Sequence, residues 1–130
     1  MPLTFRVDEE NRLVFAVASG TLTIDDLYRY QMDMWTSIEL REYNELIDLT
    51  SVDAFVPPTA DHIRDFSDFA TSMEVNSSPS KLAIVAEGDF EFGLARMFQV
   101  FRETHPQSKK EVAVFRSVPE AMKYLKTKAS

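Results

Sequence analysis

The stretch that decides the fold is Lys81–Phe101, KLAIVAEGDFEFGLARMFQVF. Its first part, Leu82–Ala86, is apolar on both faces, which is typical of a strand in the interior of a covered sheet. The apolar residues that follow recur at the spacing of an amphipathic helix, and they are Phe90, Leu94, Met97, Phe98 and Phe101. The stretch therefore predicts a buried strand that leads into a helix packed on the sheet.

The rest of the chain alternates between the same two kinds of segment. Residues 3–7 and 13–18 flank a turn cluster and predict an antiparallel hairpin. Further helices are expected at 24–38, 59–73 and 118–125, further strands at 46–49 and 112–115, and a loop at 76–80. We predict the order ββαβαβα, which begins with the hairpin and ends in three strand–helix units. This order predicts one α/β domain over residues 1–130, with a mixed five-stranded sheet whose first strand lies antiparallel at an edge.

The composition excludes several classes of chemistry. The 130 residues include no cysteine, three glycines and two histidines, His62 and His105. Disulfides, thiolate metal sites and a three-histidine site are therefore excluded, and the glycines are too few for a dinucleotide or phosphate-binding loop. We expect no cofactor and no metal. Without a signal-like or membrane-spanning stretch, the default expectation is a cytoplasmic protein.

The charge is negative overall and unevenly distributed. The net charge of −7 argues against nucleic acid as a partner, because binding phosphates requires a cationic face. Residues 1–80 carry 15 acidic and 5 basic side chains, whereas residues 81–130 carry 6 acidic and 9 basic ones. The asymmetry is read either as two solvated faces or as a functional dipole.

A ligand rim is expected beyond the carboxyl ends of the parallel strands. The predicted loops there lead to helix N-termini, whose aligned dipoles favour an anion. The candidate rim residues are Thr50, Ser51, Asp89, Arg116 and Ser117. Asp89 and Ser117 have an alternative reading as simple helix caps.

No residue is assigned a catalytic role. Asp48 is the one carboxylate inside an apolar strand, and a buried carboxyl with a raised pKa suits an acid or a base. The sequence places no partner group beside it, and a hydrogen bond to a backbone turn is the alternative. His62 and His105 are expected to be exposed, and the chain has no Gly-x-Ser-x-Gly nucleophile motif.

One face of the helix at 90–103 is a candidate interaction surface. Phe92 lies off the apolar stripe, on the side that also carries Gly93, Arg96 and Val100. Aromatic residues and arginine are enriched at the centres of protein interfaces, so these four residues suit a protein partner or a second copy of the chain. The alternative is an irregular helix start that tucks Phe92 under the preceding loop.

Four segments carry a resemblance to a known family. They are Ala18–Leu27 (ASGTLTIDDL), Leu46–Val52 (LIDLTSV), Lys81–Phe101 with its core FGLARM, and Val112–Leu125 (VAVFRSVPEAMKYL). Together they resemble the SpoIIAA-like proteins of the STAS superfamily, and the match covers nearly the whole chain. The resemblance implies a mixed sheet of four to five strands with helices chiefly on one side.

The resemblance also bears on function. Anti-sigma-factor antagonists of the superfamily are switched by phosphorylation of a serine in the turn after the third strand. That turn corresponds here to Val56–Thr59 (VPPT), so a proline stands at the phosphoacceptor position and Thr59 is read as a helix cap. SpoIIAA-like proteins are also similar to lipid carriers of the Sec14 type, which implies a role in binding an apolar ligand or a membrane surface.

These observations give two main functional hypotheses. The first is a non-enzymatic binding or regulatory module that acts on a protein partner or as a homo-oligomer through the Phe92–Val100 face. The alternative is a carrier or sensor of a small amphipathic or lipid ligand, with peripheral membrane contact. A third, an enzyme that uses Asp48 with a rim residue, has less support. A cavity beneath the helix at 90–103 would distinguish the second hypothesis from surface recognition.

Overall fold

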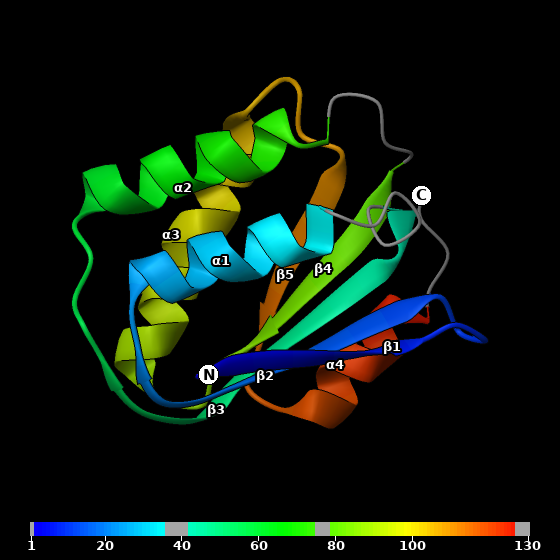
Figure 1. Ribbon diagram of the computed structural model, residues 1–130, viewed down its shortest axis with the longest axis horizontal. Helices are drawn as coiled ribbons and strands as arrows, with labels where there is room; N and C mark the ends of the chain where they lie inside the picture. Colours follow the sequence, from blue (N-terminus) through cyan, green and yellow to red (C-terminus); the bar gives the residue numbers. More distant parts are fainter. Residues whose placement is uncertain (1, 36–41, 75–78, 127–130) are drawn as a thin grey trace.

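The computed structural model describes residues 2–35, 42–74 and 79–126, which form a five-stranded sheet and four helices (Figure 1). The elements are β1 (Leu3–Asp8), β2 (Leu13–Leu22), α1 (Ile24–Trp35), β3 (Asn44–Phe55), α2 (Ala60–Ser72), β4 (Ser80–Val85), α3 (Asp89–Thr104), β5 (Lys110–Phe115) and α4 (Val118–Leu125). The observed order is ββαβαβαβα, so the predicted string ββαβαβα was one strand–helix unit short. The predicted hairpin, first helix and three final strand–helix units are all present.

The strands lie across the sheet in chain order, β1-β2-β3-β4-β5. The edge strand β1 pairs antiparallel with β2, and the other three pairings are parallel, as predicted. Every residue of β4 is buried, which confirms the expectation of an interior strand that is covered on both faces.

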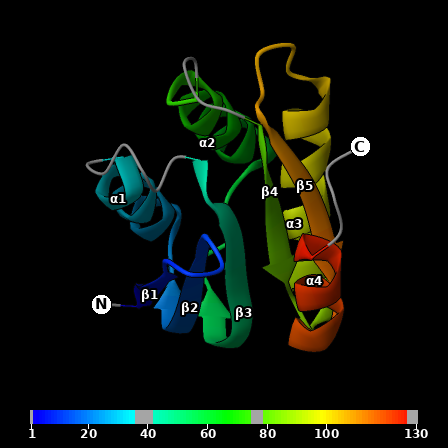
Figure 2. The same ribbon diagram turned by 90° about the vertical axis from the view of Figure 1, so that its right-hand side faces the viewer.

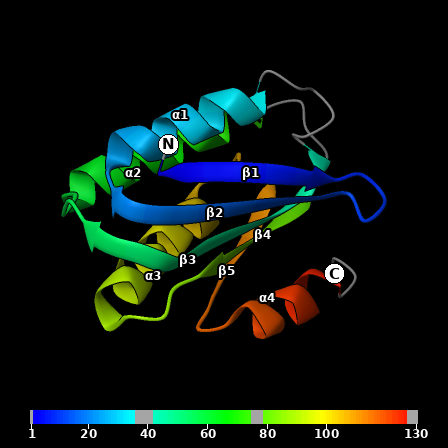
Figure 3. The same ribbon diagram turned by 60° about the horizontal axis from the view of Figure 1, so that its bottom comes forward.

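Three helices cover one face of the sheet and one covers the other. Figures 2 and 3 show α1 and α2 together on one side of the sheet and α4 apart from them. Ala95 and Phe98 of α3 belong to the same core as α1, whereas Ala121 and Leu125 of α4 belong to the core on the opposite face. Strands β2 to β5 advance in one direction across the sheet, and crossovers of a single hand then place all three connecting helices on the same face. Helix α4 follows β5 and packs on the remaining face, where Ala121 and Leu125 contact the core that contains Ala83 and Val85.

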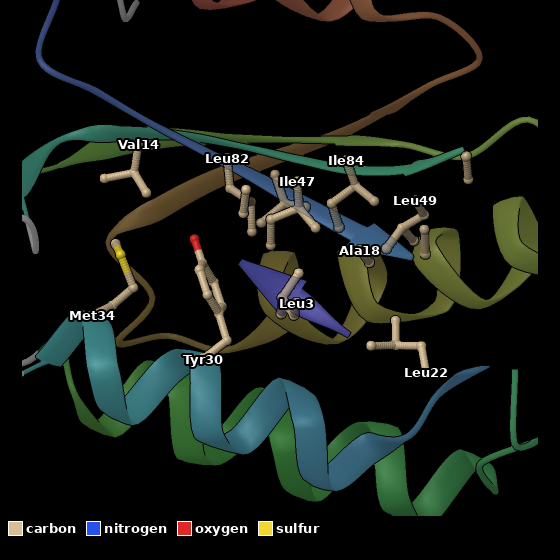
Figure 4. Close-up of a cluster of buried hydrophobic side chains, with 14 of the residues drawn as sticks. Leu3, Val14, Ala18, Leu22, Tyr30, Met34, Ile47, Leu49, Leu82 and Ile84 are labelled. Carbon is tan, nitrogen blue, oxygen red and sulfur yellow. The ribbon is translucent and has the colours of Figure 1, made fainter. Parts of the chain in front are cut away.

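Successive side chains of each strand point to opposite faces of the sheet, so the buried residues form two separate cores. The larger core lies under α1, α2 and α3, where Tyr30 and Met34 of α1 extend toward Val14, Ile47 and Leu82 of the sheet (Figure 4). The smaller core lies under α4 and contains Leu13, Leu46, Ala83, Val85, Ala121 and Leu125. Apolar burial of this kind contributes about 25 cal/mol per Å² of surface removed from water.

Strand β3 is longer than the predicted 46–49 and contains two of the predicted rim residues. Its pairing with β2 shifts register twice, between Val17 and Ser19 and between Gly20 and Thr21, so β3 bulges and continues to Phe55. Thr50 and Ser51 therefore lie within the strand rather than in a loop, which corrects the prediction. Gly20 has φ +69°, a left-handed conformation that glycine adopts without strain and that permits the second shift.

The helix boundaries follow capping chemistry. Thr59 is the N-cap of α2, where its hydroxyl accepts from the backbone N–H of His62 and the His62 side chain accepts from the N–H of Thr59. Ser117 caps α4 in the same way through the N–H of Glu120. The predicted helix 24–38 is observed as far as Trp35, and its last three residues, like most of the predicted loop 76–80, lie outside the described residues.

Candidate functional site

A cavity of about 90 Å³ lies between the sheet and helices α1, α2 and α3. Its wall comes from all three helices, from β3, β4 and β5, and from the segment that joins β3 to α2. The lining residues are Ile24, Leu27, Tyr30, Gln31, Glu45, Ile47, Leu49, Phe55, Pro58, Ile63, Phe66, Glu74, Leu82, Ile84, Glu91, Leu94, Ala95, Phe98, Arg102 and Lys110. A cavity therefore lies beneath α3, which is the observation expected to distinguish the ligand-binding hypothesis from surface recognition.

Most of the cavity wall is apolar. Ile47 and Ile84 contribute from the sheet, and Leu94 and Phe98 contribute from α3 across the space. A dry apolar cavity of about 150 Å³ accommodates benzene, so 90 Å³ suits a small hydrocarbon group of a few carbon atoms. Ligand sites are typically concave and apolar with a few polar groups that fix orientation, which matches this lining.

The polar groups gather at the amino end of the parallel strands. Glu45 is the second residue of β3, and Lys110 is the first residue of β5. Lys110 Nζ lies 2.8 Å from Glu45 Oε1 and donates to the carbonyl oxygen of Tyr43 at 2.8 Å. The hydroxyl of Tyr30 donates to Glu45 Oε2 at 2.9 Å. Burial and the Glu45 carboxylate raise the pKa of the Tyr30 phenol well above its ordinary value.

A second buried ion pair lies at the same end of the cavity. Arg102 of α3 donates to both carboxylate oxygens of Glu74, which follows α2, and both side chains are at least nine-tenths buried. Glu74 also accepts from the backbone N–H of Lys109 at 3.1 Å. Burial raises the pKa of Glu74 despite the Arg102 charge, and burial likewise lowers the pKa of Arg102.

The opposite end of the cavity opens at the carboxyl ends of the strands. The lining residues Ile24, Phe55 and Glu91 are partly exposed there, unlike the buried residues at the amino end. Phe90 is half-exposed, and its ring centroid lies 6.5 Å from that of Phe55. Phe90 therefore contributes an apolar side chain beside the opening, although the sequence predicted it in the core.

The turn that the resemblance associates with a phosphorylation switch also borders the cavity. Pro58 lines the space, and Val56 is half-exposed. The hydroxyl of Thr59 is engaged as the N-cap of α2, as predicted. This segment therefore has a structural part in the cavity wall and in starting the helix.

The remaining predicted rim residues, Asp89, Arg116 and Ser117, do not line the cavity. Arg116 donates to Asp89 Oδ1 and to the carbonyl oxygen of Glu87, each at 2.9 Å, and all three residues are exposed. Asp89 is not the helix cap, because Gly88 occupies the N-cap position of α3 without a side-chain hydrogen bond. Ser117 is a cap, which confirms its alternative reading. Arg116, Asp89 and Glu87 form an exposed cluster whose hydrogen bonds are made within the cluster.

The predicted interaction surface is divided by the structure. Gly93, Arg96 and Val100 are exposed on α3 as expected. Phe92 is partly buried against the larger core, and the guanidinium of Arg116 stacks over its ring at 4.0 Å. Phe92 therefore lies inward rather than on the exposed face, but it does so within a helix that already begins at Asp89 and not through an irregular helix start.

Asp48 has a structural setting. Its Oδ1 accepts from the backbone N–H and the hydroxyl of Thr50, at 2.9 and 2.7 Å, where β3 first shifts register. This matches the alternative reading of a carboxylate bonded to the backbone. His62 is exposed as expected, whereas His105 is partly buried, with its Nε2 3.7 Å from Asp68.

Sequence reasoning missed the buried charges at the cavity, although the sequence carried a signal for them. Glu45 precedes Ile47 and Leu49 on one face of β3, and Lys110 begins the corresponding row of β5. Arg102 lies four residues after Phe98 on the inward stripe of α3. A charged residue that continues an apolar row is the pattern that would have identified them.

A mixed five-stranded sheet with three helices on one face and a fourth on the other is a SpoIIAA-like fold, as the resemblance implied. A solved structure of this fold is that of an uncharacterized protein of the DUF3478 family from Shewanella loihica PV-4. It is 16% identical to the chain, with a TM-score of 0.58, and the match covers 95% of this chain and 93% of that one. Neither a protein-family model nor a curated protein matches the sequence.

Two general features concern membrane and metal sites. No helix within residues 2–35, 42–74 and 79–126 has the length and apolar character needed to cross a membrane. In the same residues, no three histidine, aspartate or glutamate side chains are grouped so that they could hold a metal ion.

Proposed function

We propose that this protein is a non-catalytic binding protein that takes up a small amphipathic molecule in the cavity beneath α3. The observation that carries the proposal is an apolar cavity with buried hydrogen-bonding groups at its inner end and partly exposed apolar residues at its opening. This arrangement orients a molecule with one polar end and one hydrocarbon end, polar end inward.

The ligand hypothesis has more support than surface recognition because an apolar cavity lies beneath α3. Close packing is the rule in protein interiors, and an unfilled apolar space forfeits dispersion contacts of its lining side chains. A ligand restores those contacts when it enters. The hydrogen bonds of Asp48 and of the Arg116 cluster support a structural role for these residues.

A cavity-filling substitution tests the proposal. Ala95 is buried and lines the cavity, so Ala95→Leu adds three carbon atoms to the space that a ligand would occupy. We expect native mass spectrometry of the wild type to detect a co-purified small molecule, or its melting temperature to rise with added short-chain alcohols or acids. Ala95→Leu should remove this response without lowering the melting temperature.

A matched control uses an exposed position on the same helix. Glu103→Leu makes a larger apolar change outside the cavity and should leave ligand uptake intact. The proposal fails if the wild type binds none of these compounds, or if Ala95→Leu and Glu103→Leu bind them equally.

A protein partner is a second candidate, which the exposed side of α3 favours. Val100 is half-exposed beside Arg96, and Gly93 leaves open space next to the helix. The double variant Arg96→Glu with Val100→Asp should convert an oligomer into a monomer in light scattering, whereas the control Arg64→Glu on α2 should not. A wild type that is monomeric at all concentrations would rule out self-association through this face.

A further inference from the structure

We infer that the cavity selects a ligand whose polar end is uncharged, an alcohol or a primary amide, over a carboxylate or an ammonium of the same chain length. This inference rests on the proposed function and specifies its ligand class. It follows from the way in which the buried charges at the inner end are already paired.

The four buried ionic groups at the inner end have no net charge. Lys110 is held by Glu45 at 2.8 Å, and Arg102 is held by both carboxylate oxygens of Glu74. Each of the two cations that line the cavity, among the described residues, therefore faces a carboxylate of the protein. A ligand carboxylate would bring an uncompensated negative charge next to Glu45 and Glu74, which a buried site disfavours.

At the inner end of the cavity, both a hydrogen-bond donor and a hydrogen-bond acceptor remain available to a ligand. Tyr30 donates its only hydroxyl hydrogen to Glu45, which leaves the lone pairs of its oxygen as acceptors. Lys110 has three N–H donors, and its contacts with Glu45 and the Tyr43 carbonyl account for two of them. A ligand hydroxyl both donates and accepts, so it matches one free acceptor and one free donor.

Ionised groups match only half of this pattern. A carboxylate only accepts, and an ammonium only donates and would bring a positive charge beside Lys110 and Arg102. A hydroxyl or an amide satisfies both kinds of group without adding charge. The chemistry at the inner end therefore distinguishes ligands by the charge of the polar end, and the apolar wall accepts the chain in every case.

The experiment compares 1-hexanol, hexanoate and hexylammonium, whose first carbon atoms would occupy the cavity and whose chain ends would extend into the opening. Binding to the wild-type protein is measured at neutral pH by isothermal titration calorimetry and by amide chemical-shift changes. We expect 1-hexanol to bind about tenfold or more tightly than either ion, with shifts at Tyr30 and Leu94. Tighter or equal binding of hexanoate or hexylammonium would overturn the inference and leave the proposed function standing. No binding by any of the three would overturn both.

A charge change at Glu45 provides a second test. Glu45→Gln leaves Lys110 without its carboxylate, so hexanoate should gain affinity relative to 1-hexanol by about tenfold. The control Glu103→Gln removes the same charge from an exposed position of α3 and should leave the ratio unchanged. An unchanged ratio in a folded Glu45→Gln protein would contradict the inference.

Tyr30→Phe retains the charges and covers the case in which Glu45→Gln does not fold. It removes the free acceptor, so the affinity for 1-hexanol should fall about threefold to tenfold, and the affinity for hexanoate should not fall. An equal loss for both ligands would contradict the role assigned to the Tyr30 hydroxyl.

Discussion

The buried pair of Arg102 and Glu74 gives the strongest quantitative prediction for stability. Arg102 is 3% exposed and Glu74 5%, so neither charge has water to compensate the loss of its partner. Arg102→Met retains most of the side-chain volume but leaves the Glu74 carboxylate buried and unpaired. Breaking such a pair costs about 3–5 kcal/mol of unfolding free energy. That loss is a large fraction of the roughly 5–15 kcal/mol that stabilises a domain.

Replacing both partners should have a much smaller effect. The double variant Glu74→Met with Arg102→Met removes both desolvation penalties and leaves only the backbone N–H of Lys109 without its acceptor, a loss of roughly 1–3 kcal/mol. Loss of the Arg102 contact with Ser108 adds little, because that contact is long at 3.4 Å. The double variant should therefore be more stable than the single variant Arg102→Met.

The assay is urea unfolding followed by far-ultraviolet circular dichroism, with a common slope for all variants. The pH dependence provides an independent check of the cause. Without Arg102, the buried Glu74 avoids its desolvation cost by binding a proton, so the deficit of Arg102→Met should shrink as the pH is lowered from 8 to about 5. A deficit below about 1 kcal/mol at pH 8, or one that does not change with pH, would refute the reasoning.

Three further predictions concern single positions. Gly20→Ala should lower the unfolding free energy by about 1–2 kcal/mol, because Gly20 has φ +69° in β2, and thermal unfolding measures the loss. Gly93→Ala should have the opposite effect, a gain of about 0.5–1 kcal/mol in the same assay, because a Cβ there meets no atom within 4 Å and the residue lies inside α3. Burial raises the pKa of both Tyr30 and Tyr124 above the ordinary value near 10. The unfolded chain therefore loses these protons first, and the unfolding free energy should fall as the pH rises above about 10, by up to roughly 1.4 kcal/mol per pH unit for the fully buried Tyr30 and by less for Tyr124. Urea titrations between pH 8 and 11 measure this slope, which Tyr30→Phe should reduce; an unchanged slope would contradict the burial of the Tyr30 phenol.

Much of the fold could be predicted because the decisive signals are local. The apolar run at Leu82–Ala86 and the helical spacing after it depend on nearest neighbours in the chain, and both elements are observed. The helix starts at Thr59 and Ser117 were predictable because capping is a contact between residues three apart. The length of β3 was not, because its continuation to Phe55 depends on pairing with β2 across bulges.

The position of Phe92 shows how one turn of helix limits prediction. The helical spacing of α3 was predicted correctly. In its first turn, however, the sequence placed Phe90 inward and Phe92 outward, whereas in the structure Phe92 packs against the core and Phe90 is half-exposed. The position of the Phe92 ring depends on Arg116, whose guanidinium stacks over it. The two residues are more than twenty positions apart in the sequence. No periodicity within α3 contains that information.

The candidate site was the least predictable part because it joins distant segments. The rim residues were expected where parallel strands end, whereas the buried charges lie at the opposite end, where β3 and β5 begin. The buried ion pairs partly explain the charge asymmetry between residues 1–80, which are acidic, and residues 81–130, which are basic. Glu45 and Glu74 of the acidic first half pair with Lys110 and Arg102 of the basic second half.

The sequence by itself determined the class of fold, the type of most individual elements and the exclusion of thiol and glycine-loop chemistry, because these depend on residue type and on contacts between near neighbours. Only the tertiary structure decided that α1, α2 and α3 share one face, that a cavity remains beneath α3, and that four charges are buried in pairs at its inner end. These features arise where side chains from segments far apart in the chain meet. The energy of a buried charge depends on whether its partner is within a few ångströms, which no spacing along the sequence can specify.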